Sequence, residues 1–329
     1  MDIDFHNARK PQPKKNTGLA RIGLFFMILI FVTICSLVIT CILLLRISSW
    51  RRDRPLGILV VSPTQEKSIR THLGLLWIDP LTHKMTLVDI PDSMAVETIA
   101  YGTHTADTLY GIFSIDHKSV TVFAKALSFA FGIDLRAVLV YEHPIKLTDL
   151  NEWTFWNAAF FRSPRASLRF PELFSVFWFT HSLGSSERET LALPERLFSL
   201  QQSDGQQIMV ADKVSLDRFM SKTFANPAIV TENVSLSVIN SSGLAHTGAL
   251  FGRFFTTNGC FLLSVDDTSE VKDDSQLLIS SEKLRSTKTV EFLEYYLQTK
   301  ATVDANTTAG YRSDAVVFIG KKQAMEITP

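Results

Sequence analysis

Apolar and polar positions divide the chain into one long apolar run and a series of shorter ones. No charged side chain occurs over residues 22–45. Residues 57–61 are apolar, rich in β-branched side chains and bounded by prolines, which is typical of a buried strand. Residues 73–78 and 85–90 are apolar runs separated by a segment that contains Asp and Pro. These three runs predict a strand followed by a β-hairpin.

A helix is predicted next, over residues 120–131. The apolar residues that recur there at helical spacing are Val120, Phe123, Ala124, Leu127 and Phe131. Gly132 follows them and suits the left-handed position at which many helices end. A further strand is expected over residues 137–141, and strands that alternate with helices indicate an α/β layered fold.

The last third of the chain repeats this alternation. Strands are expected over residues 234–239, 261–265, 277–280 and 314–320, and helices over residues 244–258 and 282–300. Before them, residues 221–232 are polar and contain Asn226 followed by Pro227, which predicts a boundary. The sequence therefore predicts an α/β layered domain over residues 57–225 and a small α/β sandwich domain over residues 226–329.

The long apolar run predicts a transmembrane helix over residues 22–45. At ~1.5 Å per residue it would span roughly 36 Å, more than the ~30 Å hydrocarbon core of a bilayer. No small-residue cleavage site follows it, so we expect an uncleaved signal anchor with a tail over residues 1–21 and a linker over residues 46–56. Basic residues flank both ends, and the charge rule favours a cytoplasmic N-terminus only weakly.

Composition excludes one class of partner. Lys and Arg number 33, and Asp and Glu number 33, so the chain lacks the basic excess of a nucleic-acid-binding protein. Of the cysteines, Cys35 and Cys41 fall in the apolar run, and Cys260 has no partner for an intramolecular disulfide in the globular region. The histidines lack ligand spacing, and no nucleophile elbow, zinc motif or P-loop occurs, so no metal site is expected.

Residues 153–179 are dense in aromatic side chains. They predict either a pair of core helices or an apolar groove for a lipid chain. The candidate groove residues are Trp153, Trp156, Phe160, Phe174 and Trp178.

Three arginines interrupt this aromatic stretch at helical spacing. Arg162, Arg165 and Arg169 could offer guanidinium groups to a phosphate, and the alternative is a solvated basic face. A second candidate anion site is the turn at Ser241, Ser242 and Gly243, before the helix expected from residue 244. The alternative there is simple capping of that helix.

The C-terminal region resembles a known family. Residues 235–245 end a strand in Asn-Ser-Ser-Gly before a helix, and residues 313–322 close with Asp-Ala-Val-Val and a glycine. In combination these segments are similar to the C-terminal domain of the LytR-CpsA-Psr envelope proteins. Residues 75–87, Ile90-Pro91 and residues 131–134 resemble segments of that family's catalytic domain.

The resemblance implies a membrane-tethered protein that faces outward from a bacterial plasma membrane. The family's catalytic domain binds a polyprenyl-linked phosphate or pyrophosphate and transfers a glycopolymer to the cell wall, using Mg²⁺, acidic ligands and arginines. Here Asp92 and Ser93 stand where the family has arginine and aspartate, and Thr71 or His72 stands where it has a metal-binding aspartate. The charges needed at the phosphoryl oxygens are missing from those positions.

Two hypotheses follow. The first is a non-catalytic envelope protein that binds a polyprenyl-linked lipid, a cell-wall polymer or another envelope protein and needs no cofactor. The second is a working phosphotransferase in which Arg70, Arg162, Arg165 and Arg169 replace the displaced cations and Mg²⁺ is required. They differ in whether these arginines converge with carboxylates on one pocket.

Overall fold

The computed structural model describes residues 17–47, 54–65, 69–98, 102–115, 119–145, 165–203 and 206–326. The chain divides into two compact units, Met1–Ser49 and Trp50–Pro329. In the first unit, α1 (Thr17–Ile47) is a continuous helix. Its described apolar side chains are largely exposed, among them Phe31 at 67%.

Over the part of the chain that the structure describes, no helix combines the length and apolar character that crossing a membrane requires. The transmembrane span expected over residues 22–45 is not confirmed and stays a prediction.

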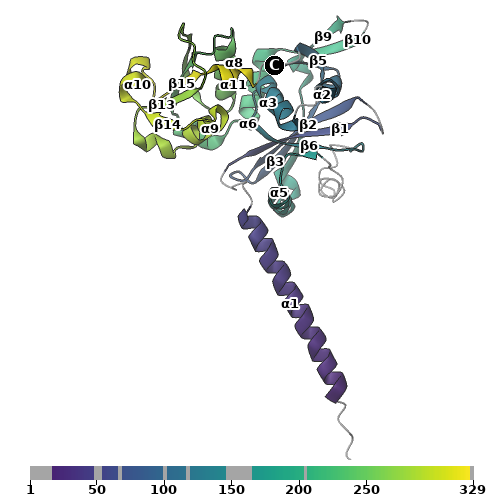
Figure 1. Cartoon of the computed structure of the whole chain (residues 1–329). Helices are drawn as coiled ribbons and strands as arrows, with labels where there is room; N and C mark the ends of the chain where they lie inside the picture. The colour runs from purple at the N-terminus through teal and green to yellow at the C-terminus, as the bar shows by residue number, and fades with distance from the viewer. Residues whose placement is uncertain are drawn as a thin grey trace, which may run out of the picture. The chain divides into compact units, whose positions relative to one another are not determined.

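The second unit is built around a mixed sheet, which we call sheet A (Figure 1). Its strand order is β7-β6-β1-β2-β3-β8. The bounds are β1 (Leu56–Pro63), β2 (Thr71–Asp79), β3 (Lys84–Ile90), β6 (Leu135–Val140), β7 (Arg165–Ala166) and β8 (Arg188–Ala192). The expected hairpin is confirmed, since β2 and β3 pair antiparallel and Asp79 accepts from the backbone N–H of Leu81 at 2.9 Å.

Sheet A is buried on both faces, which explains its almost continuous apolar strands. One face packs against α2 (Ala106–Ile115) and α3 (Val120–Phe131), and this core includes Leu75, Leu109 and Leu127. The other face packs against α5 (Phe170–Ser182), and that core includes Leu76 and Val176. Figure 1 shows α5 on the opposite side of the sheet from α2 and α3. The expected α3 is confirmed, with Gly132 at φ +70° ending it.

A second sheet, sheet B, was not predicted from the sequence. Its strand order is β5-β4-β10-β9, with β4 (Met94–Thr98), β5 (Gly102–Thr105), β9 (Phe198–Ser203) and β10 (Gln206–Ala211). Two 3₁₀ turns, η2 (Ser185–Glu187) and η3 (Glu195–Leu197), precede β8 and β9. Strands β4 and β10 pair in parallel although they lie far apart in the sequence.

The polar stretch at residues 221–232 is helical rather than an open linker. α6 (Lys213–Phe224) and α7 (Pro227–Glu232) occupy it, and Asn226 caps α7 by accepting from the N–H of Ala228 at 3.0 Å. Pro227 is tolerated because it takes the first helical position, where its missing N–H costs nothing. The domain boundary at residue 225 stays a prediction.

A third sheet, sheet C, forms the C-terminal region. Its strand order is β12-β11-β15-β13-β14, with β11 (Ser235–Asn240), β12 (Phe261–Asp267), β13 (Gln276–Ile279), β14 (Ala301–Val303) and β15 (Ala315–Ile319). The accompanying helices are α8 (Thr247–Thr257), α9 (Lys288–Leu297), α10 (Ala305–Tyr311) and α11 (Lys321–Met325). Each strand predicted in this region is present, so the layered α/β arrangement is confirmed here.

Two expected helices differ from the observed ones. The helix expected over residues 282–300 is a 3₁₀ turn, η4 (Glu282–Ser286), followed by α9, because the Thr287 hydroxyl caps α9 by accepting from the N–H of Val290 at 3.3 Å. The helix expected from residue 244 begins instead at Thr247, after His246 in a left-handed conformation at φ +63°.

Helix α3 belongs to two hydrophobic cores at once. Phe123 and Leu127 face the sheet A core, whereas Phe129 packs into the sheet C core. The Phe129 ring lies 4.8 Å from Phe251 and 4.6 Å from Phe254, both of which are buried residues of α8. The end of α3 is also close to α8, because a Cβ built at Gly132 would lie 3.0 Å from the Thr257 side chain.

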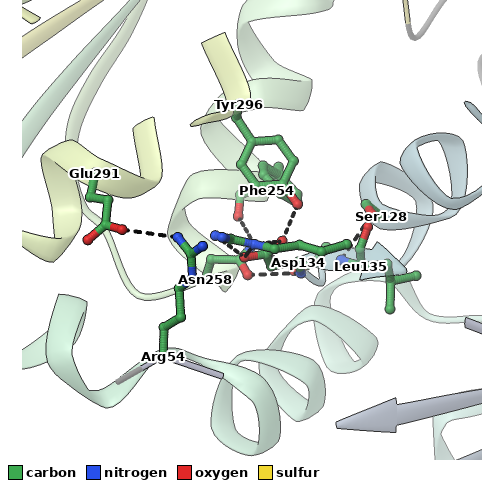
Figure 2. A network of polar contacts seen from close by, with 10 residues as sticks. Arg54, Ser128, Asp134, Leu135, Phe254, Asn258, Glu291 and Tyr296 are labelled. Carbon is green, nitrogen blue, oxygen red and sulfur yellow. Dashed lines mark hydrogen bonds and ion pairs between the residues drawn. The ribbon is translucent and has the colours of Figure 1, made fainter. Parts of the chain in front are cut away.

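A polar network seals this junction (Figure 2). The Asn258 amide accepts from the backbone N–H of Asp134 at 3.1 Å and donates to the Gly132 carbonyl at 3.1 Å. The Asp134 carboxylate accepts from Arg136 at 2.7 Å and from the Tyr296 hydroxyl. Burial and the nearby carboxylate both raise the pKa of Tyr296, so its phenol stays protonated and donates.

Arg253 of α8 makes several hydrogen bonds across the junction. Its guanidinium donates to both oxygens of the Asp217 carboxylate, on α6, at 2.7 and 2.5 Å. It also donates to the carbonyl oxygens of Phe129 and Ala130 at 3.0 and 3.1 Å, which otherwise end α3 without helical partners. One side chain therefore joins three helices.

We expect Arg253→Met to lower the free energy of unfolding by about 2 kcal/mol, because Asp217 and two carbonyl groups lose charged donors in a partly buried junction. Arg253→Lys keeps the positive charge but lacks the planar guanidinium fork, so its free energy of unfolding should fall between those of the unchanged chain and Arg253→Met. Urea denaturation of the purified chain in detergent measures both changes.

Arg285→Met is the matched control, because Arg285 pairs with Glu282 in an exposed turn and such pairs contribute little. Equal losses for Arg253→Met and Arg285→Met would contradict the role given to Arg253.

Candidate functional site

A groove of about 870 Å³ lies between sheet B and helices α3, α6 and α8. We call it the α3–α8 groove. Sheet B contributes Met94, Ala95, Val96, Glu97, Thr98, Gly102, Thr103, Gln201, Ile208, Val210 and Ala211. The helices and the segment before α8 contribute Ala126, Phe129, Ala130, Phe131, Lys213, Leu216, Ala245, His246, Thr247, Ala249, Leu250 and Arg253.

Small side chains on the facing helices make room for the groove. Ala126 and Ala130 are one turn apart on α3, and Ala249 is exposed on α8 opposite sheet B. The sheet side is lined by Met94 and Val96, which are also part of the sheet A core. The lining is more apolar than polar, and a cavity of this size suits a ligand of lipid or drug size with a long apolar part.

The cations that line the groove, within the described residues, are engaged by other groups. Lys213 forms an ion pair with Glu97 at an exposed edge, with side-chain exposures of 70% and 59%. Arg253 is held by Asp217 and by two backbone carbonyls. A phosphate or pyrophosphate entering this groove would have to compete with those partners.

A second polar cluster lies on sheet A, where the family resemblance places a metal-binding aspartate. The His72 ring contacts Asp89 through Nε2 at 2.7 Å and Asp92 through Nδ1 at 2.7 Å. The hydrogen bond to Asp89 is the largest influence and, with Asp92, raises the pKa of His72 to about 9 despite partial burial. At neutral pH an imidazolium therefore lies between the two carboxylates.

This arrangement does not fit a magnesium ion. Asp92 is hydrogen-bonded to His72 and Asp89 forms an ion pair with it, and among the described residues no group of three or more His, Cys, Asp or Glu side chains is arranged to hold a metal. Asp92, which stands where the family resemblance places an arginine, is thus paired with a cation of the protein itself. The pairing of His72 with Asp89 and Asp92 was missed by sequence reasoning, since only the hairpin register brings the three together.

The candidate phosphate-binding arginines do not meet in the described structure. Arg70 is exposed and lies 3.6 Å from Asp107 of α2, on one side of sheet A. Arg169 is exposed just before α5, on the other side of the sheet. Arg165 lies in β7, with its side chain outside the description, and Arg162 lies outside the described residues.

The candidate lipid-groove residues are not in the α3–α8 groove where the structure describes them. Phe174 and Trp178 lie on α5, on the opposite face of sheet A. Trp153, Trp156 and Phe160 lie outside the described residues. Sequence reasoning missed the α3–α8 groove; its one local signal is Ala126 and Ala130, which recur at helical spacing on α3.

The anion site expected at the turn before α8 stays a prediction, and two of its three N–H groups already have partners inside the protein. Ser241 and Ser242 are buried, and their N–H groups donate to the Ile319 carbonyl at 3.1 Å and to the Asn240 side chain at 3.2 Å. The helix begins three residues after Leu244, so Gly243 is not at its first turn. The N–H groups of Ser241 and Ser242 are therefore engaged inside the protein.

We expect His72 to titrate near pH 9, above its ordinary value of about 6.5. A pKa raised by folding adds stability that is complete below pH ~6.5 and is lost as the pH rises through 9. His72→Gln should therefore destabilise the chain at pH 6, with a deficit that shrinks by pH 9.5. Urea midpoints across that range measure this effect.

His104→Gln, at a half-buried histidine of β5, is the matched control for the loss of an imidazole away from Asp89 and Asp92. If NMR shows that the His72 imidazole titrates near pH 6.5, the pairing of His72 with Asp89 and Asp92 is contradicted.

No protein-family model matches the sequence, and no curated protein matches it. The similar solved structures include LytR-CpsA-Psr family proteins, and they cover about half of this chain. Bacillus subtilis TagV is 10% identical over 51% of this chain and 95% of its own, with a TM-score of 0.39. The LytR-CPS2A-psr family protein YwtF (TagT) with bound octaprenyl pyrophosphate lipid is 12% identical over 53% and 91%, with a TM-score of 0.38. The transcriptional regulator yvhJ from Bacillus subtilis is 13% identical over 51% and 94%, with a TM-score of 0.36. TM-scores below 0.5 do not by themselves assign the chain to a family.

Proposed function

We propose that this chain is a membrane-tethered cell-envelope protein that binds the apolar part of a lipid in the α3–α8 groove without transferring a group. The observation that carries this proposal is the groove itself, with about 870 Å³ of space and a largely apolar lining. Burying apolar chain against such a lining is favourable and requires no charge. The sequence resemblance to LytR-CpsA-Psr proteins supplies the expectation that the lipid is polyprenyl-linked.

The charge arrangement favours binding over catalysis. Phosphoryl transfer needs cations aimed at the developing charge, and removing one such donor costs of order 100-fold in rate. In the described groove, Lys213 and Arg253 face carboxylates of the protein. The resemblance places a metal-binding aspartate at Thr71 or His72, and His72 is paired with Asp89 and Asp92.

The alternative is a phosphotransferase that uses Mg²⁺ and relocated arginines. It requires Arg70, Arg162, Arg165 and Arg169 to act together. The opposite placement of Arg70 and Arg169 on sheet A does not favour this arrangement.

The tether in this proposal is the uncharged run over residues 22–45, which is long enough for a bilayer if helical. The orientation follows the sequence resemblance, with the N-terminus in the cytoplasm and residues 50–329 outside the plasma membrane. The flanking basic residues are compatible with it.

We expect the purified chain to retain a long-chain polyprenyl alcohol in native mass spectrometry and to leave a polyprenyl pyrophosphate unhydrolysed in the presence of Mg²⁺. Ala249→Trp, at an exposed site on the groove wall, should weaken lipid binding at least about tenfold, a loss of about 1.4 kcal/mol, by filling the space. Ala126→Trp, on the α3 wall of the groove, should also weaken lipid binding.

Val214→Trp is the matched control, because Val214 is exposed on α6 outside the groove lining. Unchanged lipid binding in both Ala249→Trp and Ala126→Trp would rule out the α3–α8 groove as the lipid-binding site. Turnover of the pyrophosphate that is lost in Arg70→Ala or Arg165→Ala would establish the transferase alternative.

For the orientation, we expect Val271→Cys to react with a membrane-impermeant thiol reagent in intact cells, because Val271 is 57% exposed. Asp4→Cys, in the N-terminal tail, should react only after lysis. Native Cys260 adds little background, since burial strongly raises the pKa of its thiol. The reverse labelling pattern would place the globular unit in the cytoplasm.

A further inference from the structure

Helix α5 is apolar on its outer face as well as its inner one. The inner residues Leu173, Val176 and Phe179 are buried against sheet A. The outer residues Phe170, Phe174 and Trp178 follow at four-residue spacing, so they form one stripe along the helix. Trp178 is 54% exposed and Phe170 58%. A helix that is apolar on both faces normally has both faces covered.

The Trp178 half of α5 lies at the same edge of sheet A as the β2–β3 turn. Phe179 contacts His83 of that turn, with ring centroids 5.7 Å apart. The same turn presents Leu81, which is 46% exposed. Trp178 and Leu81 thus mark one apolar edge, which we call the α5 edge.

The chain enters the globular unit at this edge. Leu56, the first residue of β1, pairs with Ile78 at the end of β2 and belongs to the same core as Phe179 and Leu183. Between the end of the uncharged run at Leu45 and Arg54 stand residues 46–53, which reach at most about 30 Å when extended. Arg54, two residues before β1, therefore lies no farther than about 30 Å from Leu45.

We propose that the outer stripe of α5 and Leu81 seat in the interfacial layer of the bilayer that holds the anchor. This inference rests on the proposed membrane tether. Tryptophan prefers the headgroup level, where its ring is apolar and its N–H finds polar partners. The exposed Arg169 and Lys84 flank the stripe and the turn, and they suit contact with anionic lipid headgroups.

Seating on the bilayer would fix the tilt of the globular unit on its tether. A short linker alone restrains distance, whereas a second contact restrains rotation as well. The bilayer surface then covers the exposed parts of Trp178 and Leu81.

The test uses the full chain in vesicles of phosphatidylcholine with about one quarter phosphatidylglycerol. Brominated phosphatidylcholine, which quenches tryptophan fluorescence, is present in one set and absent from the other. Flotation with the vesicles is measured first, because it shows whether the chain is anchored in the bilayer. We expect Trp178→Phe to remove part of the emission that brominated lipid quenches. Trp77→Phe, at a buried core position, should remove emission that the lipid does not quench.

Leu81→Trp provides a gain of signal at an exposed turn, where folding tolerates the change. We expect its added emission to be quenched, and that of Val303→Trp, at an exposed site of β14, to remain unquenched. A chain that floats but shows no quenching at positions 178 and 81 overturns this inference and leaves the tether standing. Concentration-dependent burial of Trp178 without quenching, which indicates a second copy on the stripe, also overturns it. A chain that does not float overturns the tether and the inference together.

Discussion

The packing of α3 against α8 is the contact on which the rest of the globular unit depends. α3 gives Phe123 and Leu127 to the sheet A core and Phe129 to the sheet C core, so neither core is complete without it. Arg253 then bonds the last carbonyls of α3 and the Asp217 carboxylate in one guanidinium fork. The guanidinium group suits this position, because its N–H donors lie in one plane and point toward several acceptors.

The groove is a consequence of that same contact. Because α3 presents large side chains to the two cores, its remaining arc carries Ala126 and Ala130, which leave space beside sheet B. α8 closes the other wall, so the C-terminal region contributes directly to a cavity of the preceding region. Stability and ligand space are therefore coupled: a change that loosens Arg253 alters the wall on which a bound lipid would rest.

Local signals were predictable from the sequence, and long-range pairing was not. The Asp79 turn and the Gly132 helix end depend on neighbours within a few residues, so their patterns identify them. Sheet B escaped prediction because β4 and β10 are short and pair across more than a hundred residues. The bond between Arg253 and Asp217 escaped for the same reason, since an isolated arginine on a helix resembles a solvated one. Thr287 shows the limit of periodicity, because one capping hydroxyl divides what reads as a single helix.

The aromatic block illustrates why residue type alone cannot locate a site. Phe174 and Phe179 are the same side chain on one helix, yet one lies on the outer face and the other is 3% exposed in the core. The sequence identifies the excess of apolar surface, and the fold decides that the described part of it lies on α5, away from the α3–α8 groove. Two apolar surfaces then serve different ends in our proposals: a concave one suits a single lipid chain, and a convex helix stripe suits the surface of a bilayer. Both surfaces are apolar, and the difference between them is their shape, which the sequence pattern did not indicate.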